Sequence, residues 1–392
     1  VYYKKSTSTL TKGLRNFHNL YVKTKLIFAA AERGNSLVDL AVGKGGDMPK
    51  WIKRSLGLVL GIDLSRDNIE NRIDGACARY LSNSLKFQNM PTCLFVQGNS
   101  SLNIRSGEGI NTDKGKEIVN AIFGKGPNDE NKLGSVVHSS YGVASEGFDV
   151  VSCQFAIHYF CENKHTFVNF LRNVTECCKV GGYFIGTSYD GKDVFNLLKN
   201  KKQGESECLS KKDTKIWSIT KLYDNDEFLD NISSLGYAID VYQDSINKTT
   251  KEYLVNYDYL FETLSEFGFE LLTSDEAFHL NLPSSTGTFG ELFNKMELEI
   301  SKYPNAAAEY GNCNSMSWEE RKISRLNRYF IVKKVREVNI DDIYIVKDIN
   351  SVEALEHTES VEAQDAAIKA TKANTHKATK TKQKIKIGKI NT

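Results

Sequence analysis

Apolar segments of strand length recur along the first half of the chain, and segments of helical period separate them. The five apolar segments are SLVDLA (36–41), GLVLGID (57–63), CLFVQG (93–98), FDVVSCQF (148–155) and GGYFIGTS (181–188). Their nearly continuous hydrophobicity is typical of parallel strands that are buried on both faces. Alternation of such strands with helices predicts an α/β fold, with a doubly wound and mostly parallel sheet.

Further elements follow from the same patterns. A helix is predicted within residues 164–178, because its apolar residues fall on one stripe of helical period. The stripe consists of Phe167, Phe170, Leu171, Val174 and Cys178. Later strands are predicted at GYAIDVY (236–242), FELLT (269–273) and RYFIVKKV (328–335).

Composition divides the chain into segments. Residues 98–147 are rich in Gly, Ser, Asn and Asp, and we expect an insertion there with one short helix around KEIVNAIF. From about residue 351 aromatic residues and apolar periodicity disappear, so 351–392 is predicted to be a disordered basic tail, joined by a linker at 338–350. The main domain is expected at 37–337, and 1–36 is expected to complete its ligand site.

Overall composition is that of an ordinary soluble globular protein, with 40% hydrophobic and 26% charged residues among 392. The formal net charge of +2 favours no class of partner. Eight cysteines are scattered without C-x-x-C pairs or Cys/His clusters, so neither disulfides nor a metal site is predicted. No apolar run reaches about 18 residues and no secretory signal is present, so we expect an intracellular protein that does not bind membranes.

The segment VDLAVGKGGDMPKW (38–51) carries the first candidate chemistry. A strand that runs into a glycine turn and then a helix brings a ligand close to backbone N–H groups. A Walker A loop is excluded, because no glycine precedes Gly43 at the required spacing and Lys44 is followed by Gly45. A dinucleotide fingerprint lacks its third glycine, and Asp47 would repel a pyrophosphate.

A cofactor with an ammonium and a carboxylate but no phosphate suits this loop better, and S-adenosylmethionine is such a cofactor. Asp39 and Asp47 could accept hydrogen bonds from its amino end, while Gly43 and Gly45 allow close approach of the backbone. Asp63 ends the next strand, where a carboxylate can accept from both ribose hydroxyls. The alternative is that Asp63 caps the following helix.

Six blocks of sequence, taken together, resemble a known family. They are LRNFHNLYVKTKLI (14–27), the glycine-loop segment, GIDLS, SCQFAIHYF, GGYFIGTSYDG and KEYLVNYDYLFETL. In this order they resemble the mRNA cap guanine-N7 methyltransferases, from about Leu14 to about Lys334. The resemblance implies the class I S-adenosylmethionine-dependent methyltransferase fold, with insertions that form a cap-binding face. It also implies S-adenosylmethionine as cofactor, S-adenosylhomocysteine as product and the capped RNA 5′ end as substrate.

The resemblance carries expectations about context. In large DNA viruses this domain is often the C-terminal part of a larger capping enzyme, and a chain that starts at Val1 rather than Met would fit such a segment. Upstream triphosphatase and guanylyltransferase domains are then expected, and the need for a stimulatory subunit is open. The expected location is the host cytoplasm, in a virus factory or virion, for a viral protein, and the nucleus for a cellular one.

The resemblance implies a set of cofactor-binding residues. Lys23 is expected at the cofactor carboxylate, although one extra residue between Asn19 and Lys23 leaves Lys25 as an alternative. The full set is Lys23, Asp39, Gly43, Gly45, Asp63, Asn99, Gln154 and Tyr159. Two positions depart from the family pattern, since Ala41 stands for a glycine and Asn99 for an aspartate. An amide can still hydrogen-bond to adenine, so binding is expected to survive.

The resemblance also places His158, Glu252 and Tyr329 at the cap guanine. Guanine presents two donors, N1–H and N2–H, on one edge, and a single carboxylate can accept both. Without the other blocks, these three residues would be taken for a structural histidine, a surface glutamate and a packed tyrosine. Asn19 and Arg79 are weaker candidates for contacts with the cap or its phosphates, and Tyr189 replaces a proline beside the guanine pocket.

The implied chemistry is methyl transfer to guanine N7, which needs no general base because N7 carries a lone pair and no proton. Catalysis is then expected to rest on in-line positioning. An alternative is a catalytically silent RNA-binding or stimulatory subunit on the same fold. A nicotinamide-dependent oxidoreductase is disfavoured by the glycine spacing. The Lys-rich tail could add RNA affinity or act as a linker, and both remain open.

Overall fold

The structure is a computed structural model that describes residues 10–244, 246–343, 345–346 and 349. The predicted tail at 351–392 lies outside the described residues. The chain divides into two compact units, Val1–Val338 and Asn339–Thr392. Of the second unit, one short 3-10 turn is described at Ile340–Asp342, and all that follows concerns the first.

The main sheet has the strand order β10-β12-β5-β4-β1-β2-β3, with β11 paired to β12. Its strands are β1 (Ser36–Asp39), β2 (Leu58–Asp63), β3 (Thr92–Gln97), β4 (Phe148–Gln154), β5 (Cys178–Tyr189), β10 (Phe269–Leu271), β11 (Thr286–Thr288) and β12 (Asn327–Lys334). Strands β1 to β5 pair in parallel and β12 pairs antiparallel to β5. The predicted doubly wound, mostly parallel sheet is therefore confirmed.

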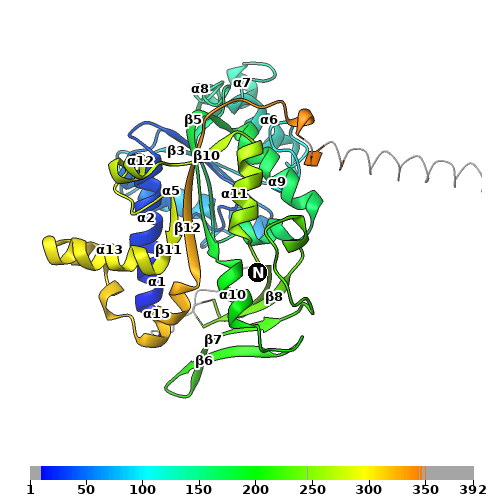
Figure 1. Ribbon diagram of the computed structural model, residues 1–392. Coiled ribbons are helices and arrows are strands. Elements are labelled where there is room, and N and C mark those ends of the chain that lie inside the picture. Colours follow the sequence, from blue (N-terminus) through cyan, green and yellow to red (C-terminus); the bar gives the residue numbers. More distant parts are fainter. Residues whose placement is uncertain (1–9, 245, 344, 347–348, 350–392) are drawn as a thin grey trace, which may run out of the picture. The chain divides into compact units, whose positions relative to one another are not determined.

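Helices cover both faces of this sheet. Figure 1 shows α1 (Lys12–Asn16) and α2 (Lys23–Ala30) on one side of the strands, and α9 (Lys164–Cys177) and α11 (Tyr257–Glu266) on the other. The predicted stripe is confirmed for Phe167, Phe170, Leu171 and Val174, which are at most 1% exposed on α9. Cys178 is also buried, but it lies past the end of the helix and begins β5. The helix begins in a capping box formed by Asn163 and Thr166. No helix in the described part of the chain combines the length and hydrophobicity needed to cross a membrane.

A second sheet of four antiparallel strands packs at one end of the main sheet (Figure 1). It consists of β6 (Ser206–Lys211), β7 (Thr214–Lys221), β8 (Ala238–Gln243) and β9 (Lys248–Tyr253). Directly opposite residues in antiparallel strands share a face, so Trp217, Gln243, Val241, Ile239 and Glu252 lie on one face of this sheet. Of its strands the sequence predicted β8 alone, because β6 and β9 are polar.

The predicted insertion contains more helix than expected. Helix α6 (Asp113–Ile122) contains most of the predicted KEIVNAIF helix, and α7 (Glu130–Leu133) and α8 (Ser135–Ser139) follow it. These two helices span one turn each and carry little apolar periodicity, so the pattern could not reveal them. The insertion packs beside α9 through Asn103 and Arg105, which contact Glu176.

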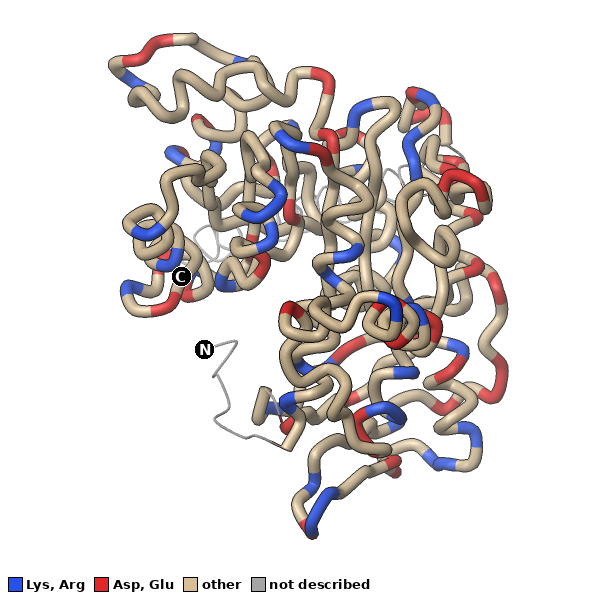
Figure 2. Tube along the Cα trace, turned by 90° about the vertical axis from the view of Figure 1, so that its left-hand side faces the viewer, with Lys and Arg blue, Asp and Glu red and all other residues tan. Residues whose placement is uncertain are grey.

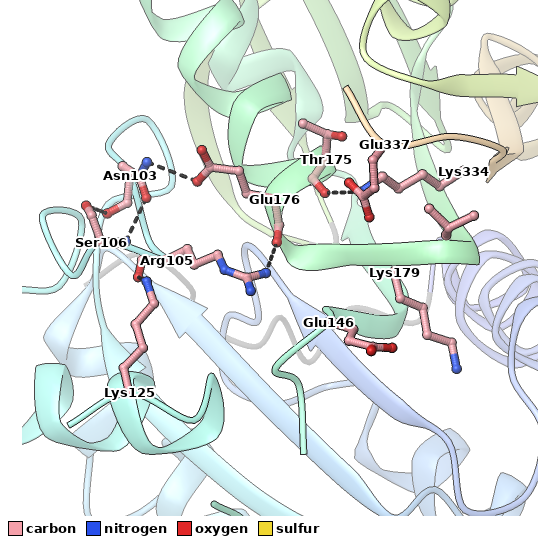
Figure 3. Close-up of a pocket in the computed structure, with 11 residues that line it drawn as sticks. Asn103, Arg105, Ser106, Lys125, Glu146, Thr175, Glu176, Lys179, Lys334 and Glu337 are labelled. Atoms are coloured by element: carbon pink, nitrogen blue, oxygen red, sulfur yellow. Dashed lines mark hydrogen bonds and ion pairs between the residues drawn. The ribbon is translucent and has the colours of Figure 1, made fainter. Parts of the chain in front are cut away.

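A cavity of about 920 Å³ opens where the insertion meets the end of α9 (Figure 3). It lies at the amino end of β5, away from the carboxyl ends of the parallel strands. Its cations already donate to backbone carbonyls: Arg105 to Glu176, Lys125 to Arg105, and the buried Lys334 to Thr175. The contacts of Arg105 and Lys334 stabilise the C-terminus of α9, where carbonyls lack helical partners.

Candidate active site

The candidate site lies at the carboxyl ends of β1, β2 and β4. Strand β1 sits between β2 and β4, so the chain connections leave it in opposite directions. At such a switch point the loops diverge and leave a crevice for a ligand. The glycine loop after β1 enters this crevice together with Asp63 from β2 and Gln154 from β4.

The glycine loop is shaped by left-handed backbone conformations at Gly43 (φ +55°) and Gly45 (φ +67°). A β-carbon added at Gly43 would meet no atom within 4 Å, so the loop faces open space there. The Gly43 N–H donates to Asp63 Oδ2 at 2.8 Å, and Asp63 Oδ1 accepts from the Ser65 N–H at 2.9 Å. The helix after β2 is capped by Ser65, so the alternative role of Asp63 as its cap is wrong.

Asp39, Asp47 and Lys50 are buried beneath this loop, and Lys23 beside them is partly exposed. Asp47 lies 3.1 Å from Lys23 Nζ and 2.8 Å from Lys50 Nζ. Burial alone would raise the pKa of Asp47, but the two lysines outweigh it and hold that pKa well below its usual value. Asp39 has no such cation in contact, and burial followed by repulsion from Asp47 raises its pKa to about 7. The site thus presents one fixed anion and one carboxyl that a bound cation would ionise.

A π-helix immediately before Lys23 determines how Lys23 and Lys25 are oriented. Residues Phe17–Val22 form this π-helical segment between α1 and α2, and the Lys23 N–H donates to the His18 carbonyl five residues back. A π turn holds one residue more than an α turn, which accommodates the extra residue seen in the sequence. Lys25 points elsewhere and pairs with Glu299 at 2.6 Å. Of the two lysines, Lys23 is the one that lies beside Asp47 of the glycine-loop segment.

Two aromatic contacts that the sequence did not reveal hold Lys23 in place. Phe155, directly after β4, adopts a left-handed conformation (φ +56°), which is uncommon for a bulky residue. The His18 ring stacks on the Phe155 ring with centroids 5.3 Å apart, and Lys23 Nζ lies 5.5 Å from the same ring. No sequence signal marks this conformation, because it depends on packing between segments more than a hundred residues apart.

A second group of polar side chains faces the crevice from β4, from the 3-10 helix Ile157–Cys161 that follows it, and from β9. Gln154 accepts from Thr187 at 3.1 Å, while its buried Nε2 has no partner in the described chain. His158 is buried, both ring nitrogens lack hydrogen-bond partners there, and its Nε2 lies 3.7 Å from Glu252 Oε2. Buried unpaired polar atoms are costly, so a ligand that pairs with them would be favoured.

Burial sets the ionisation of this pair. It lowers the pKa of His158 to about 3, so the imidazole is neutral at physiological pH. It raises the pKa of Glu252 to about 7, and the hydrogen bond from Thr250 partly offsets that rise. A neutral imidazole offers one donor and one acceptor, and the carboxylate offers two acceptors. The pair therefore matches a ligand edge with both donors and acceptors.

Tyr189 joins the two sheets beside this pair. Its hydroxyl lies 3.1 Å from Trp217 Nε1 and 2.5 Å from Gln243 Nε2, both on the second sheet. Burial, with a smaller contribution from Glu252, raises the pKa of Tyr189 above its usual value. Tyr189 is thus a buried bridge that fixes β5 against the sheet carrying Glu252.

The remaining predicted residues differ in how well the structure supports them. Tyr159 is partly exposed beside His158, with ring centroids 4.2 Å apart. Asn99 follows β3 and accepts from the Ser101 N–H. Tyr329 is 0% exposed and its hydroxyl lies 3.2 Å from Ser284 Oγ, so the structure does not bring it to the His158–Glu252 pair.

Asn19 and Arg79 lie at the rim. Asn19 donates to the Arg15 carbonyl at 2.9 Å and is partly exposed on the π-helix. Arg79 follows Ala76 by three residues, and a β-carbon added at Gly45 would lie 3.5 Å from that of Ala76. Its guanidinium makes no hydrogen bond or ion pair with any described residue. Among residues 10–244, 246–343, 345–346 and 349, no cluster of His, Cys, Asp and Glu could hold a metal ion.

Comparison with known proteins agrees with this geometry. The probable mRNA-capping enzyme of Acanthamoeba polyphaga mimivirus is 28% identical over 370 residues, which are 90% of this chain and 30% of that protein. The mRNA cap guanine-N(7) methyltransferase of Candida glabrata is 27% identical over 349 residues, 85% of this chain and 70% of the relative. The enzyme of the same name from Saccharomyces cerevisiae is 26% identical over 279 residues, 69% of this chain and 53% of the relative.

This chain therefore spans less than a third of the mimivirus protein and about half of the Saccharomyces cerevisiae one. The family model of the mRNA (guanine-N(7))-methyltransferase domain matches residues 2–335, which include the crevice and both sheets. The chain belongs to the mRNA (guanine-N(7))-methyltransferase domain family.

Proposed function

We propose that this chain transfers a methyl group from S-adenosylmethionine to N7 of the guanine that caps RNA 5′ ends. The observation that carries the proposal is the buried pair of Glu252 and neutral His158, which faces the crevice beside the glycine loop. This pair supplies acceptors and a donor at the place where a base would meet the cofactor. A crevice that bound only the cofactor would not need the Glu252–His158 pair.

The cofactor side of the crevice fits S-adenosylmethionine, which supplies an activated methyl group when it is bound. Lys23 would hold its carboxylate, and Asp39 with Asp47 would accept from its amino group. Asp63 would accept from the ribose hydroxyls, and the open space above Gly43 would admit the adenosyl unit. The amino acid end would thus enter the Lys23–Asp47 ion pair, and each of its charges would face an opposite one.

On the substrate side, Glu252 would accept from guanine N1–H and N2–H, and the His158 ring would donate to O6. Adenine presents an unprotonated ring nitrogen and a donor amino group at the corresponding positions. It would leave the Glu252 carboxylate short of a donor, which a buried anion tolerates poorly. The pair would therefore select guanine.

No residue of the chain has to move a proton in this reaction. Guanine N7 has a lone pair and no proton at neutral pH, so its methylation needs alignment and exclusion of water. His158, whose pKa lies near 3, would stay neutral throughout and orient the base. Arg79 and Asn19 would contact the phosphates or the cap from the rim.

The longer relatives suggest a wider context. We infer that other capping steps are carried by domains that accompany this chain, because the matched residues are 30% of the mimivirus relative, which is named a probable mRNA-capping enzyme. The chain would then act where RNA ends are capped, in the host cytoplasm for a viral protein or the nucleus for a cellular one.

The test is to incubate the purified chain with methyl-labelled S-adenosylmethionine and RNA that carries an unmethylated guanosine cap, then to identify the labelled nucleotide. We expect label at guanine N7. Glu252→Ala should lower capped-RNA turnover at least tenfold while it leaves the Kd for S-adenosylmethionine within about twofold.

Cofactor binding without transfer would instead favour the silent or stimulatory subunit. Equal loss of cofactor and cap binding in Glu252→Ala would remove the assignment of Glu252 to guanine.

A further inference from the structure

The Glu252 carboxyl group must ionise although it is buried. It must be ionised to accept from both guanine donors, yet its side chain is buried and burial favours the protonated form. A protonated Glu252 would present a donor where guanine also presents donors. Some group in the structure must therefore favour the ionised form.

Three groups face Glu252 from the elements packed around it. His158 lies 3.7 Å away but is neutral, so it contributes no positive charge. Tyr189 keeps its proton at physiological pH, and its hydroxyl contacts Trp217 and Gln243. Neither of these two groups stabilises the anion by a direct hydrogen bond.

The third group is Thr250, whose Oγ1 donates to Glu252 Oε1 at 3.1 Å. No other hydrogen bond from a described residue reaches the Glu252 carboxylate. Thr250 and Glu252 are two residues apart on β9, so their side chains share a face. They lie opposite Val241 and Ile239, which are at most 2% exposed. The threonine is thereby held in one place against the core, with its hydroxyl directed to Oε1 while Oε2 faces His158.

We propose that Thr250 is a positioning residue that orients the Glu252 carboxylate toward the cap guanine and sets the pH range in which it is ionised. The part that concerns guanine rests on the proposed function. The hydrogen bond and its effect on ionisation do not.

Three variants test the proposal. Thr250→Val keeps the shape and removes the donor, and Thr250→Ser keeps the hydroxyl. Thr249→Val makes the same change one residue away, at an exposed position on the opposite face of β9. The kinetics for capped RNA are measured between pH 6 and pH 9 at saturating S-adenosylmethionine.

We expect Thr250→Val to raise KM about three- to tenfold at pH 7 with little change in kcat, since one hydrogen bond to a charged group is lost. The difference should shrink above pH 8.5, where Glu252 is ionised in both proteins. Thr250→Ser and Thr249→Val should resemble the wild type. A rise in KM that is the same at every pH, or no rise, would overturn the proposal.

A second measurement separates this proposal from the proposed function. The Glu252 carboxyl carbon is followed by ¹³C NMR against pH without RNA, with Glu252→Gln used to identify its signal. A higher titration midpoint in Thr250→Val supports the role of Thr250 even if the wild type methylates no cap. An unchanged midpoint rejects that role even if cap methylation is intact.

Discussion

Burial at a few residues creates most of the chemistry of this site. Glu252 and Asp39 both have a pKa raised to about 7, and each lies where a positively polarised ligand group is expected. Asp47, by contrast, is buried beside Lys23 and Lys50, and these two lysines keep it ionised. The crevice therefore combines charges that are fixed before binding with carboxyls that respond to pH.

The first prediction concerns the pH dependence of cap affinity. In the proposed function Glu252 would bind the guanine donors as the carboxylate. With a pKa of about 7, its ionised fraction rises from about a tenth at pH 6 to about nine tenths at pH 8. KM for capped RNA should therefore fall up to about tenfold over that range, measured at saturating S-adenosylmethionine. Glu252→Gln should show a weak, nearly flat profile. A wild-type KM that rises with pH would contradict the assignment.

The second prediction separates two neighbouring lysines. Lys23→Met removes the cation beside Asp47 and should raise the Kd for S-adenosylmethionine at least tenfold in calorimetry. Lys25→Met, the matched control, breaks a pair with Glu299 outside the crevice and should change that Kd less than twofold. A larger rise in Kd for Lys25→Met than for Lys23→Met would show that the π-helix does not direct Lys23 to the cofactor.

At the scale of elements, the glycine loop and the π-helix bring distant segments to one crevice. The loop follows β1, the π-helix precedes it, and both depend on backbone conformations that few sequences adopt. The second sheet then supplies Glu252, and Tyr189 fixes it to β5. Each element contributes a small number of side chains, and none forms a site alone.

The third prediction compares two glycines with similar backbone strain. Gly43→Ala and Gly34→Ala both place a side chain at positive φ without a steric neighbour, so each should lower the free energy of unfolding by about 1–2 kcal/mol. Only Gly43→Ala projects its methyl group into the crevice. It should raise the Kd for S-adenosylmethionine severalfold, while Gly34→Ala leaves it unchanged. Equal Kd values in the two variants would place the cofactor away from the loop.

The main sheet was predictable because its strands are apolar and bounded by glycines. The glycine loop likewise indicates, from its sequence, where a cofactor would bind. The second sheet was mostly missed, since β6 and β9 present polar residues to solvent and their pairing depends on distant partners. For the same reason, Glu252 was found through the family resemblance and its buried environment was not foreseen. Phe155 and Thr250 carry no sequence signal of their function, because their roles arise from contacts.

At the scale of the whole molecule, charge is mixed. Figure 2 shows basic and acidic segments interspersed over the chain in this view, and three lysines near the crevice, Lys23, Lys44 and Lys50, are paired with carboxylates. The surface of the described residues therefore gives RNA little sequence-independent attraction. A cation at the rim without a partner among the described residues, such as Arg79, would then contribute a large share of the attraction for RNA phosphates.

The fourth prediction follows from this balance. Arg79→Ala should raise KM for capped RNA severalfold and reduce the slope of log KM against log salt concentration by about 0.7 to 1. Lys53→Ala is the control, because Lys53 is exposed and already paired with Glu309. If both variants keep the wild-type slope, Arg79 does not contact phosphate.

The position of β12 in the main sheet also limits when this domain can fold during synthesis. In the described chain β12 pairs with β5, β10 and β11, and Lys334 at its end secures the C-terminus of α9. A nascent chain that has not yet exposed residue 334 outside the ribosome therefore lacks the partner of three strands. Until then the edge of β5 can pair with strands of other chains. Chaperones that bind exposed strand edges would act on this domain before β12 is added.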